Sequence, residues 1–194
     1  MSNPTFLSSE DILSTLRELN ANVTLPLWLS GGVAVDFLVG RWTRPHGDID
    51  FNTLANLRDD LTQELGRIGY TTSDPGWLTQ WFQDPRGQRL EIAFLEQIAD
   101  GTAVLEIRDG DPVGVPGTYP LLPDYLDLNR FAILEGVKFR VCSPAGEWLA
   151  RANGIDVVGG RTREPKIEHD LQLLESMIPE AELARLRSTF GGTD

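Results

Sequence analysis

The chain has 194 residues, of which 41% are hydrophobic and 24% charged, and its net charge is −12. This is the composition of an ordinary globular protein, and the length suits one domain or two small ones. The acidic balance argues against a nucleic-acid-binding protein, which needs a basic surface, and it is compatible with a cationic ligand. No run of residues is long and apolar enough to predict a membrane span.

The cysteine content and the N-terminal segment predict a cytoplasmic protein. Cys142 is the single cysteine and has no partner for an internal disulfide, so we expect a buried thiol in a reducing compartment. The first residues, MSNPTFLSSEDIL, lack the basic and apolar regions of a signal peptide. No pattern in the sequence indicates an oligomeric state.

The first two-thirds of the chain predict a mixture of helices and strands. Ser8 and Asp11 have the spacing of a helix cap, and polar and apolar residues alternate over 48–53 with the period of a strand. Asp84 to Gly87 has the composition of a turn between two strands. The elements expected in chain order are a helix over 9–20, a strand over 26–29, a helix over 33–38, a strand over 48–53, a helix over 57–68 capped by Asn56, and strands over 70–72, 78–83, 89–95, 104–107 and 137–141.

The last third of the chain predicts helices only. Ser143 is a suitable cap and Pro144 suits the first helical position. Two further helices are expected over 165–178 and 179–190. The fold class is therefore α+β, with a mixed sheet flanked by helices and a small helical C-terminal region. We place the boundary at 142, which gives a first domain over 1–142 and a helical region over 143–194.

Two acids on the predicted strand 48–53 suggest a metal site. Residues two apart on a strand point to the same face, so the carboxylates of Asp48 and Asp50 would repel each other unless a cation lies between them. Oxygen ligands of this kind suit Mg²⁺. Glu91 lies in an otherwise apolar strand and would supply a third carboxylate if the two strands are neighbours. The alternatives are a solvated strand face for the aspartates and a salt bridge from Glu91 to Arg89 or Arg86.

The turn at Ser30-Gly31-Gly32 lies between a predicted strand and a predicted helix. Glycines at this position allow backbone N–H groups to approach a phosphate, and the helix N-terminus adds partial positive charge. Ser30 would add a hydroxyl donor. The alternative is that the glycines serve close packing only.

Taken together, these motifs resemble a known family. The runs SGGVAVD at 30–36 and GRWTRPHGDID at 40–50 are similar to the nucleotidyltransferase superfamily with a DNA polymerase β-like fold. The branch they most resemble contains the aminoglycoside 2''-adenylyltransferases and the lincosamide nucleotidyltransferases. Weaker similarity continues through VKFRVCSPAGEW at 137–148 and EPKIEHDL at 164–171. Two positions depart from the pattern, with Val33 where tryptophan is usual and Glu91 where aspartate is usual.

The resemblance implies an enzyme that uses ATP and two Mg²⁺ ions to move a nucleoside monophosphate onto a hydroxyl, releasing pyrophosphate. Asp48 and Asp50 would then be metal ligands and catalytic residues, and Glu91 a metal ligand or general base. Arg44 and Lys166, with Arg41 as a further candidate, would join the turn at Ser30-Gly31-Gly32 in binding the triphosphate. For each of these basic residues, surface solvation or a salt bridge is the alternative.

The acceptor and the function remain open at this point. An aminoglycoside or lincosamide antibiotic is expected as acceptor, with antibiotic resistance as the consequence, and the acidic composition favours a cationic compound. The aromatic residues Trp77, Trp81 and Trp148 are candidates for stacking on a base or a sugar, with core packing as the alternative. Other functions are a non-catalytic nucleotide-binding module of this fold and a toxin-like transferase acting on RNA or protein. The absence of a basic patch argues against RNA.

Overall fold

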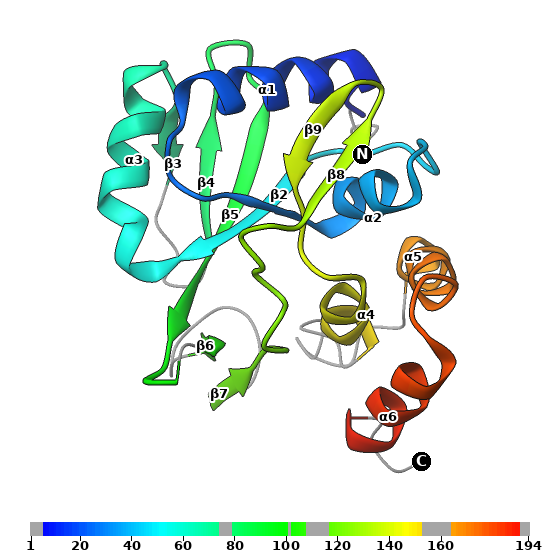
Figure 1. Cartoon of the computed structure of the whole chain (residues 1–194). Helices are drawn as coiled ribbons and strands as arrows, with labels where there is room; N and C mark the ends of the chain where they lie inside the picture. Colours follow the sequence, from blue (N-terminus) through cyan, green and yellow to red (C-terminus); the bar gives the residue numbers. More distant parts are fainter. Residues whose placement is uncertain (1–5, 74–78, 101, 108–116, 153–163, 191–194) are drawn as a thin grey trace.

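The computed structural model of the chain describes residues 6–73, 79–100, 102–107, 117–152 and 164–190 (Figure 1). Its helices are α1 (Ser9–Asn22), α2 (Gly31–Val39), α3 (Arg58–Arg67), α4 (Pro144–Ala152), α5 (Pro165–Glu175) and α6 (Glu180–Phe190). Its strands are β1 (Trp28–Ser30), β2 (Ile49–Leu54), β3 (Thr71–Ser73), β4 (Thr79–Gln83), β5 (Arg89–Gln97), β6 (Ala103–Ile107), β7 (Gly117–Pro120), β8 (Phe131–Leu134) and β9 (Val137–Arg140). The predicted α+β class, with strands and helices mixed in the first two-thirds of the chain and helices in the last third, is confirmed.

The strands that carry the predicted carboxylates are neighbours in one sheet. The strand order is β1-β2-β5-β4-β3, with β2 and β5 parallel and the other pairs of this path antiparallel. The register aligns Ser30 with Asp50, Asp50 with Glu91, and Glu91 with Trp81. Residues directly opposite each other point to the same face of a sheet. Ser30, Asp50, Glu91 and Trp81 therefore form one row across four strands, which we call, together with Asp48, the polar row.

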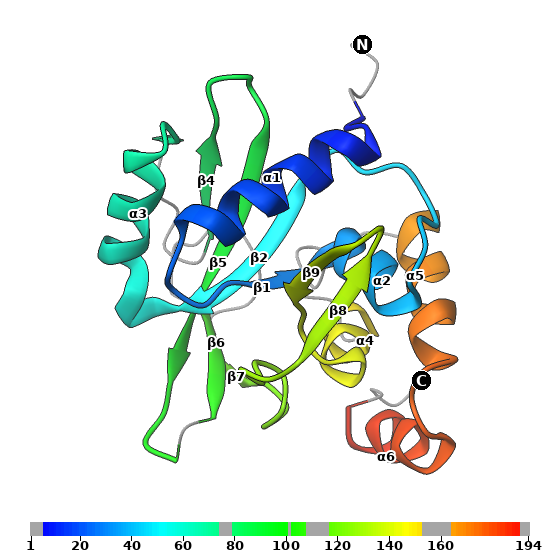
Figure 2. The same ribbon diagram turned by 45° about the horizontal axis from the view of Figure 1, so that its top comes forward.

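The face of the sheet opposite this row forms the main core. The alternate residues Ile49, Phe51, Leu90 and Ile92 are fully buried there. Helix α1 lies across this face and α3 beside it (Figures 1 and 2). The apolar side chains of β2 and β5 are therefore held by helices on one side, which leaves their polar side chains on the other.

The start of α1 follows its predicted capping pattern. The Ser8 hydroxyl accepts a hydrogen bond from the Asp11 N–H at 3.1 Å, and the Asp11 carboxylate accepts one from the Ser8 N–H at 3.3 Å. These contacts satisfy two backbone donors that the first turn of a helix leaves without partners. A local sequence pattern was sufficient here because both partners lie within one turn.

The C-terminal helices pack against α2 rather than against the sheet core. Leu171 and Leu174 of α5 and Leu186 of α6 belong to one cluster of buried side chains with Val35 of α2. Figure 1 shows α4, α5 and α6 gathered at the side away from α1 and α3. The helical region begins at Pro144, two residues after the predicted boundary, while the division into two domains stays a prediction.

Three features of the strand and helix assignment differ from expectation. Asn56 does not cap α3, because it lies in a short 3-10 turn (Ala55–Leu57), after which α3 begins at Arg58 with no side-chain cap. Strands β7 and β8 were not predicted. Helix α2 begins at Gly31 rather than Val33, so the glycine pair forms its first turn. Among the described residues, no helix is long and apolar enough to cross a membrane.

Candidate active site

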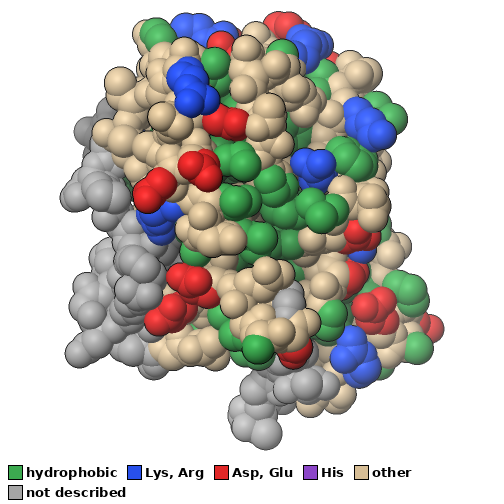
Figure 3. Space-filling model, turned by 60° about the vertical axis from the view of Figure 1, so that its left-hand side comes forward, with side chains coloured by type: hydrophobic (Ala, Val, Ile, Leu, Met, Phe, Trp, Pro, Cys, Tyr) green, Lys and Arg blue, Asp and Glu red, His purple; other side chains and the backbone are tan. Residues whose placement is uncertain are grey.

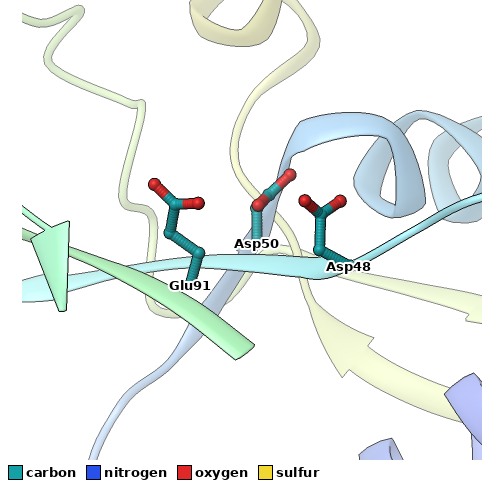
Figure 4. A group of neighbouring side chains, drawn as sticks. All are labelled: Asp48, Asp50 and Glu91. Atoms are coloured by element: carbon teal, nitrogen blue, oxygen red, sulfur yellow. The ribbon is translucent and has the colours of Figure 1, made fainter. Parts of the chain in front are cut away.

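The structure brings together the three carboxylates that the sequence singled out. Asp48 lies one residue before β2, Asp50 lies within β2, and Glu91 lies opposite Asp50 on β5. Each side chain offers an oxygen atom, and these oxygen atoms lie within 4.8 Å of one another. Figure 4 shows the three carboxylates rising from the same side of the two strands. The predicted proximity of Glu91 to the aspartates is confirmed.

The electrostatics of this cluster disfavour its fully charged form. Burial, followed by the charges of Asp48, Glu91 and Glu147, raises the pKa of Asp50 from 3.8 to about 8. Burial and the charge of Asp48 also raise the pKa of Glu91. No salt bridge joins any of the three acids to another residue within the described ranges. The charges of Arg89 and Arg151 act in the opposite direction, on Glu91 and Asp50 respectively, but are outweighed. The cluster has the donor set that suits a divalent metal ion.

The glycine pair is required by the side chains that lie against it. Gly31 has φ +67°, and a Cβ atom at this position would overlap the Asp50 carboxylate. A Cβ atom on Gly32 would overlap the Arg44 guanidinium. The Gly31 N–H donates to the Glu147 carboxylate at 3.1 Å, so this amide has a protein partner. The turn therefore serves close packing against charged groups, whatever it binds in addition.

A second charged cluster lies behind the turn and was missed in the sequence. We define the buried charge network as Glu147, Arg151, Asp170 and Arg44. Arg151 pairs with Glu147 at 2.5 Å and with Asp170 at 3.5 Å. Arg44 donates two hydrogen bonds to Asp170, at 2.9 and 3.0 Å. The network connects α4 and α5 to the glycine turn and balances two negative charges with two positive ones.

Glu147 connects this network to the strand of the aspartates. Its carboxylate accepts a hydrogen bond from the Tyr125 hydroxyl at 2.9 Å, and that hydroxyl accepts one from the Asn52 side chain at 2.9 Å. Glu147 is 1% exposed, which is unusual for an acid on a short helix. Its position between Ala145 and Trp148 in an apolar stretch was the available signal, because it indicates burial on both sides.

The loop before β2 is held by Asp36. The fully buried Asp36 carboxylate accepts from the Thr43 N–H at 3.1 Å and lies 2.6 Å from His46 Nε2. The other ring nitrogen, His46 Nδ1, lies 3.3 Å from the Arg44 guanidinium. Asp36 and His46 therefore position the segment that leads into Asp48.

The remaining predicted residues have clear positions. Lys166 is exposed and its Nζ lies 3.0 Å from Glu164, and Arg41 is also exposed. Ser30 is buried and makes no side-chain cap hydrogen bond to α2. The phosphate-binding roles predicted for Ser30, Gly31, Gly32, Arg44 and Lys166 stay predictions. Arg86 pairs with Asp84 at 2.6 Å and with Glu18 at 3.5 Å, so it is not the partner of Glu91.

The three candidate aromatic residues differ in environment. Trp148 is 5% exposed and donates from its indole N–H to Glu175 at 3.0 Å, which makes it a core residue. Trp81 is 40% exposed and lies directly opposite Glu91 in the sheet register. Trp77 lies outside the described residues. Cys142 is buried, as predicted, and its sulfur accepts a hydrogen bond from the Asn52 side chain at 3.3 Å.

A mixed sheet with two acids at the start of one strand and a third on its parallel neighbour is the arrangement expected of the nucleotidyltransferase class. The comparison with known families agrees. The chain belongs to the aminoglycoside-2''-adenylyltransferase family, whose sequence profile matches residues 11–174. The resemblance seen in the sequence motifs is thereby confirmed.

Two curated relatives share part of the chain. A 2''-aminoglycoside nucleotidyltransferase of Klebsiella pneumoniae is 33% identical over 101 residues, which make up 52% of this chain and 44% of the relative. A protein of the same name from Escherichia coli is 31% identical over 101 residues. The match thus spans less than half the length of these relatives, so their activity and substrates do not transfer with the family name.

Solved structures share the fold over nearly the whole chain. ANT(2'')-Ia in complex with adenylyl-2''-tobramycin gives a TM-score of 0.74 at 19% identity, covering 93% of this chain and 97% of that chain. The lincosamide antibiotic adenylyltransferase LnuA, bound to lincomycin, gives a TM-score of 0.65 at 20% identity, covering 90% of this chain and 100% of that chain. At these identities the likeness shows the fold alone.

Proposed function

We propose that the chain transfers AMP from ATP to a hydroxyl group of an aminoglycoside antibiotic and releases pyrophosphate. In this reaction the acceptor oxygen forms a bond to the α-phosphorus, the bond from that phosphorus to the pyrophosphate oxygen breaks, and the hydroxyl proton passes to a base. The observation that carries the proposal is the row of Asp48, Asp50 and Glu91 on two parallel strands, with their oxygen atoms within 4.8 Å of one another.

The donor set suits Mg²⁺, and we propose two ions, as the family resemblance implies. Three carboxylates without a salt-bridge partner among the described residues, one of them with its pKa raised to about 8, form a site in which added positive charge is favoured. Bound Mg²⁺ would supply positive charge to neutralise the phosphates and the pyrophosphate leaving group. Asp48 and Asp50 would hold the ions, with Glu91 as a further ligand.

The residues of the chain would bind and orient the two substrates. The α2 N-terminus carries partial positive charge and lies beside Asp50, so the triphosphate would lie there, against Ser30, Gly31 and Gly32. Arg44 and Lys166 would complete the phosphate site. Glu91, with a pKa above the ordinary value for glutamate, is the proposed base for the acceptor hydroxyl.

The acceptor class is proposed from charge and from the family. A net charge of −12 and an acidic site attract cationic compounds over long range, and an aminoglycoside carries several ammonium groups. A lincosamide is the second candidate acceptor, because the structure of LnuA with lincomycin has the same fold. The proposal further includes a cytoplasmic protein, a role in antibiotic resistance, and two domains over 1–142 and 143–194.

Two other functions make different predictions. A non-catalytic nucleotide-binding module of this fold would bind ATP without turnover, while a toxin-like transferase would label RNA or protein. The three grouped acids favour catalysis, since a binding module has no use for a general base beside the metal ligands.

An acceptor panel with ATP and Mg²⁺, scored by pyrophosphate release, tests the proposal. Tobramycin, lincomycin, RNA and a protein extract are the acceptors, and the Asp48→Asn variant is the background control. Release that depends on tobramycin and disappears in the variant supports the proposal. ATP binding without release on any acceptor would instead favour the binding module, and labelled RNA or protein would favour the toxin-like transferase.

A further inference from the structure

Trp81 is an exposed aromatic side chain at the end of the polar row, next to Glu91. It lies directly opposite Glu91 on the neighbouring strand and is 40% exposed. The Trp81 and Thr79 side chains lie near the Glu91 carboxylate. The indole therefore borders the proposed base, while part of its surface remains open to a ligand.

The face of the Trp81 ring is covered by Arg89, a cationic side chain of the same chain. The central carbon of the Arg89 guanidinium lies 3.6 Å from the ring centroid, which is cation–π geometry. Arg89 is exposed and lies two residues before Glu91 on the same strand face. At a solvent-exposed position such a contact is weak, so another cation can replace the guanidinium.

The topology places Trp81 on the acceptor side of the site, given the function proposed above. The glycine turn and the α2 N-terminus follow β1 directly, on one side of β2, while β5 and β4 lie on the other side. Substitution at the α-phosphorus is in line, so the acceptor approaches from the side opposite the leaving pyrophosphate. With the phosphates at the glycine turn, the acceptor reaches the phosphorus by passing over Glu91 and Trp81.

We infer that Trp81 is the platform for an amino-sugar ring of the acceptor and that Arg89 is a resting cover, which an ammonium group of the acceptor displaces. The ring face then binds the apolar side of the sugar, and the neighbouring carboxylate of Glu91 attracts its cationic groups. The exchange breaks no covalent bond and moves no proton, because one cation replaces another and Arg89 returns to water.

Calorimetric titration with tobramycin, in the absence of ATP, tests the inference on the intact chain. Trp81→Ala is expected to raise the Kd for tobramycin about tenfold, whereas Trp81→Phe, which keeps an aromatic face, stays within about threefold of the parent. Arg89→Ala is expected to bind tobramycin about threefold more tightly, because a competing cation has been removed.

Phe131→Ala is the matched control. Phe131 is 41% exposed and also lies beneath cationic side chains, with Lys138 and Arg140 at 4.4 and 5.1 Å from its ring centroid. It belongs to the separate β8–β9 hairpin rather than to the polar row. This variant is expected to bind tobramycin like the parent, which separates an effect of the site from a general loss of exposed aromatic surface.

The outcomes separate this inference from the proposed function. Equal Kd values for Trp81→Ala and the parent, or weaker binding by Arg89→Ala, overturn the inference. A parent that transfers AMP to tobramycin with no role for Trp81 keeps the proposed function and removes the platform. Tobramycin binding that depends on Trp81, in a chain that transfers no AMP, keeps the inference about Trp81 and removes the proposed function. Thermal melting checks the fold, and Arg89→Ala decides the question if Trp81→Ala does not fold, since it leaves the platform in place.

Discussion

Two groups of acids within one fold differ in what neutralises them. In the buried charge network, Glu147 pairs with Arg151 and Asp170 pairs with Arg44, so each carboxylate has a guanidinium partner. At the polar row on the other side of the glycine turn, three carboxylates lie together and form no salt bridge with any described residue. Each carboxylate of the network therefore has a counter-ion within the chain. The crowded acids of the row have no salt-bridge partner of this kind in the described part of the chain, which is why we propose the metal site there and not in the network.

The surface of the molecule shows a similar contrast between regions. Figure 3 shows apolar side chains gathered near the centre of one face, with charged side chains distributed around them. Exposed charged side chains of this kind are ordinarily solvated. Asp48, Asp50 and Glu91 differ from them because they are partly buried as well as crowded.

The largest expected effect is on the polar row. Asp48→Asn or Asp50→Asn is expected to lower AMP transfer by about 10³-fold or more, because the variant loses charge that holds the metal ions at the phosphates. The melting temperature without metal is expected to stay the same or rise, since a repulsive charge is removed. Pyrophosphate release and thermal melting measure the two effects.

Asp59→Asn is the control for this pair, because Asp59 is an exposed acid in the first turn of α3. It is expected to keep parental turnover. Near-normal turnover in Asp50→Asn would show that the row is not a metal centre and would remove the contrast with the buried network.

The next effect concerns the buried network and is on stability. Asp170→Ala leaves Arg44 and Arg151 without their shared carboxylate and is expected to lower the free energy of unfolding by about 3–5 kcal/mol. Glu10→Ala, which breaks the exposed pair with Arg17, is expected to cost less than about 1 kcal/mol. Urea denaturation measures both, and similar losses in the two variants would contradict a structural role for the network.

Glu91→Gln distinguishes a base from a structural acid within the row. If Glu91 accepts the hydroxyl proton, the single-turnover rate should fall about 10²-fold while ATP affinity changes little. Glu91→Asp should retain part of the activity, because the shorter carboxylate keeps the function at a different distance. A destabilised Glu91→Gln protein with a normal chemical step would assign Glu91 a purely structural role.

The glycine turn permits a matched comparison of strain and contact. Gly31 and Gly40 have φ values of +67° and +78°, but only at Gly31 would a Cβ atom meet a neighbouring side chain, the Asp50 carboxylate. Both alanine variants are expected to lose about 1 kcal/mol of stability from the backbone alone. Gly31→Ala should in addition weaken Mg²⁺-dependent ATP binding about tenfold, as displaced metal ligands do. Equal ATP affinities, measured by calorimetry, would separate the turn from the metal site.

The last prediction concerns the pH dependence of stability without metal. The pKa of Asp50 is about 8 in the folded chain and 3.8 in its ordinary state. Between these values the folded chain holds a proton that the unfolded chain has released, so the free energy of unfolding falls as pH rises through this window. Asp50→Asn should reduce that slope. Urea denaturation at pH 5, 7 and 9 measures it, and identical slopes in the two proteins would contradict the raised pKa.

The three acids of the polar row could be identified from the sequence because each one is marked by a local pattern, whereas their pairing could not. Period-two alternation places Asp48 and Asp50 on one face, and an acid within an apolar strand marks Glu91. The register that sets Asp50 opposite Glu91 comes from parallel pairing of strands separated by α3 and two further strands, which no local pattern contains. The family motifs replaced that missing long-range information.

The features missed in the sequence depend on tertiary contacts. Glu147 and Asp170 resemble ordinary helix acids until α4 and α5 are folded against the glycine turn. Strand β8, with the sequence FAIL, has no alternation and is partly exposed, so neither period nor burial identifies it. Asn56 has good capping chemistry, but the chain forms a 3-10 turn at that point and starts α3 at Arg58.

A crystal structure of the chain grown with Mn²⁺ and a non-hydrolysable ATP analogue is the most direct test of the central claim. Mn²⁺ has the ligand preferences of Mg²⁺ and is located by its anomalous scattering. We expect anomalous peaks bounded by the carboxylates of Asp48, Asp50 and Glu91, with the analogue's phosphates beside the glycine turn. Nucleotide bound elsewhere, or Mn²⁺ absent from the three acids at saturating concentration, would contradict the account.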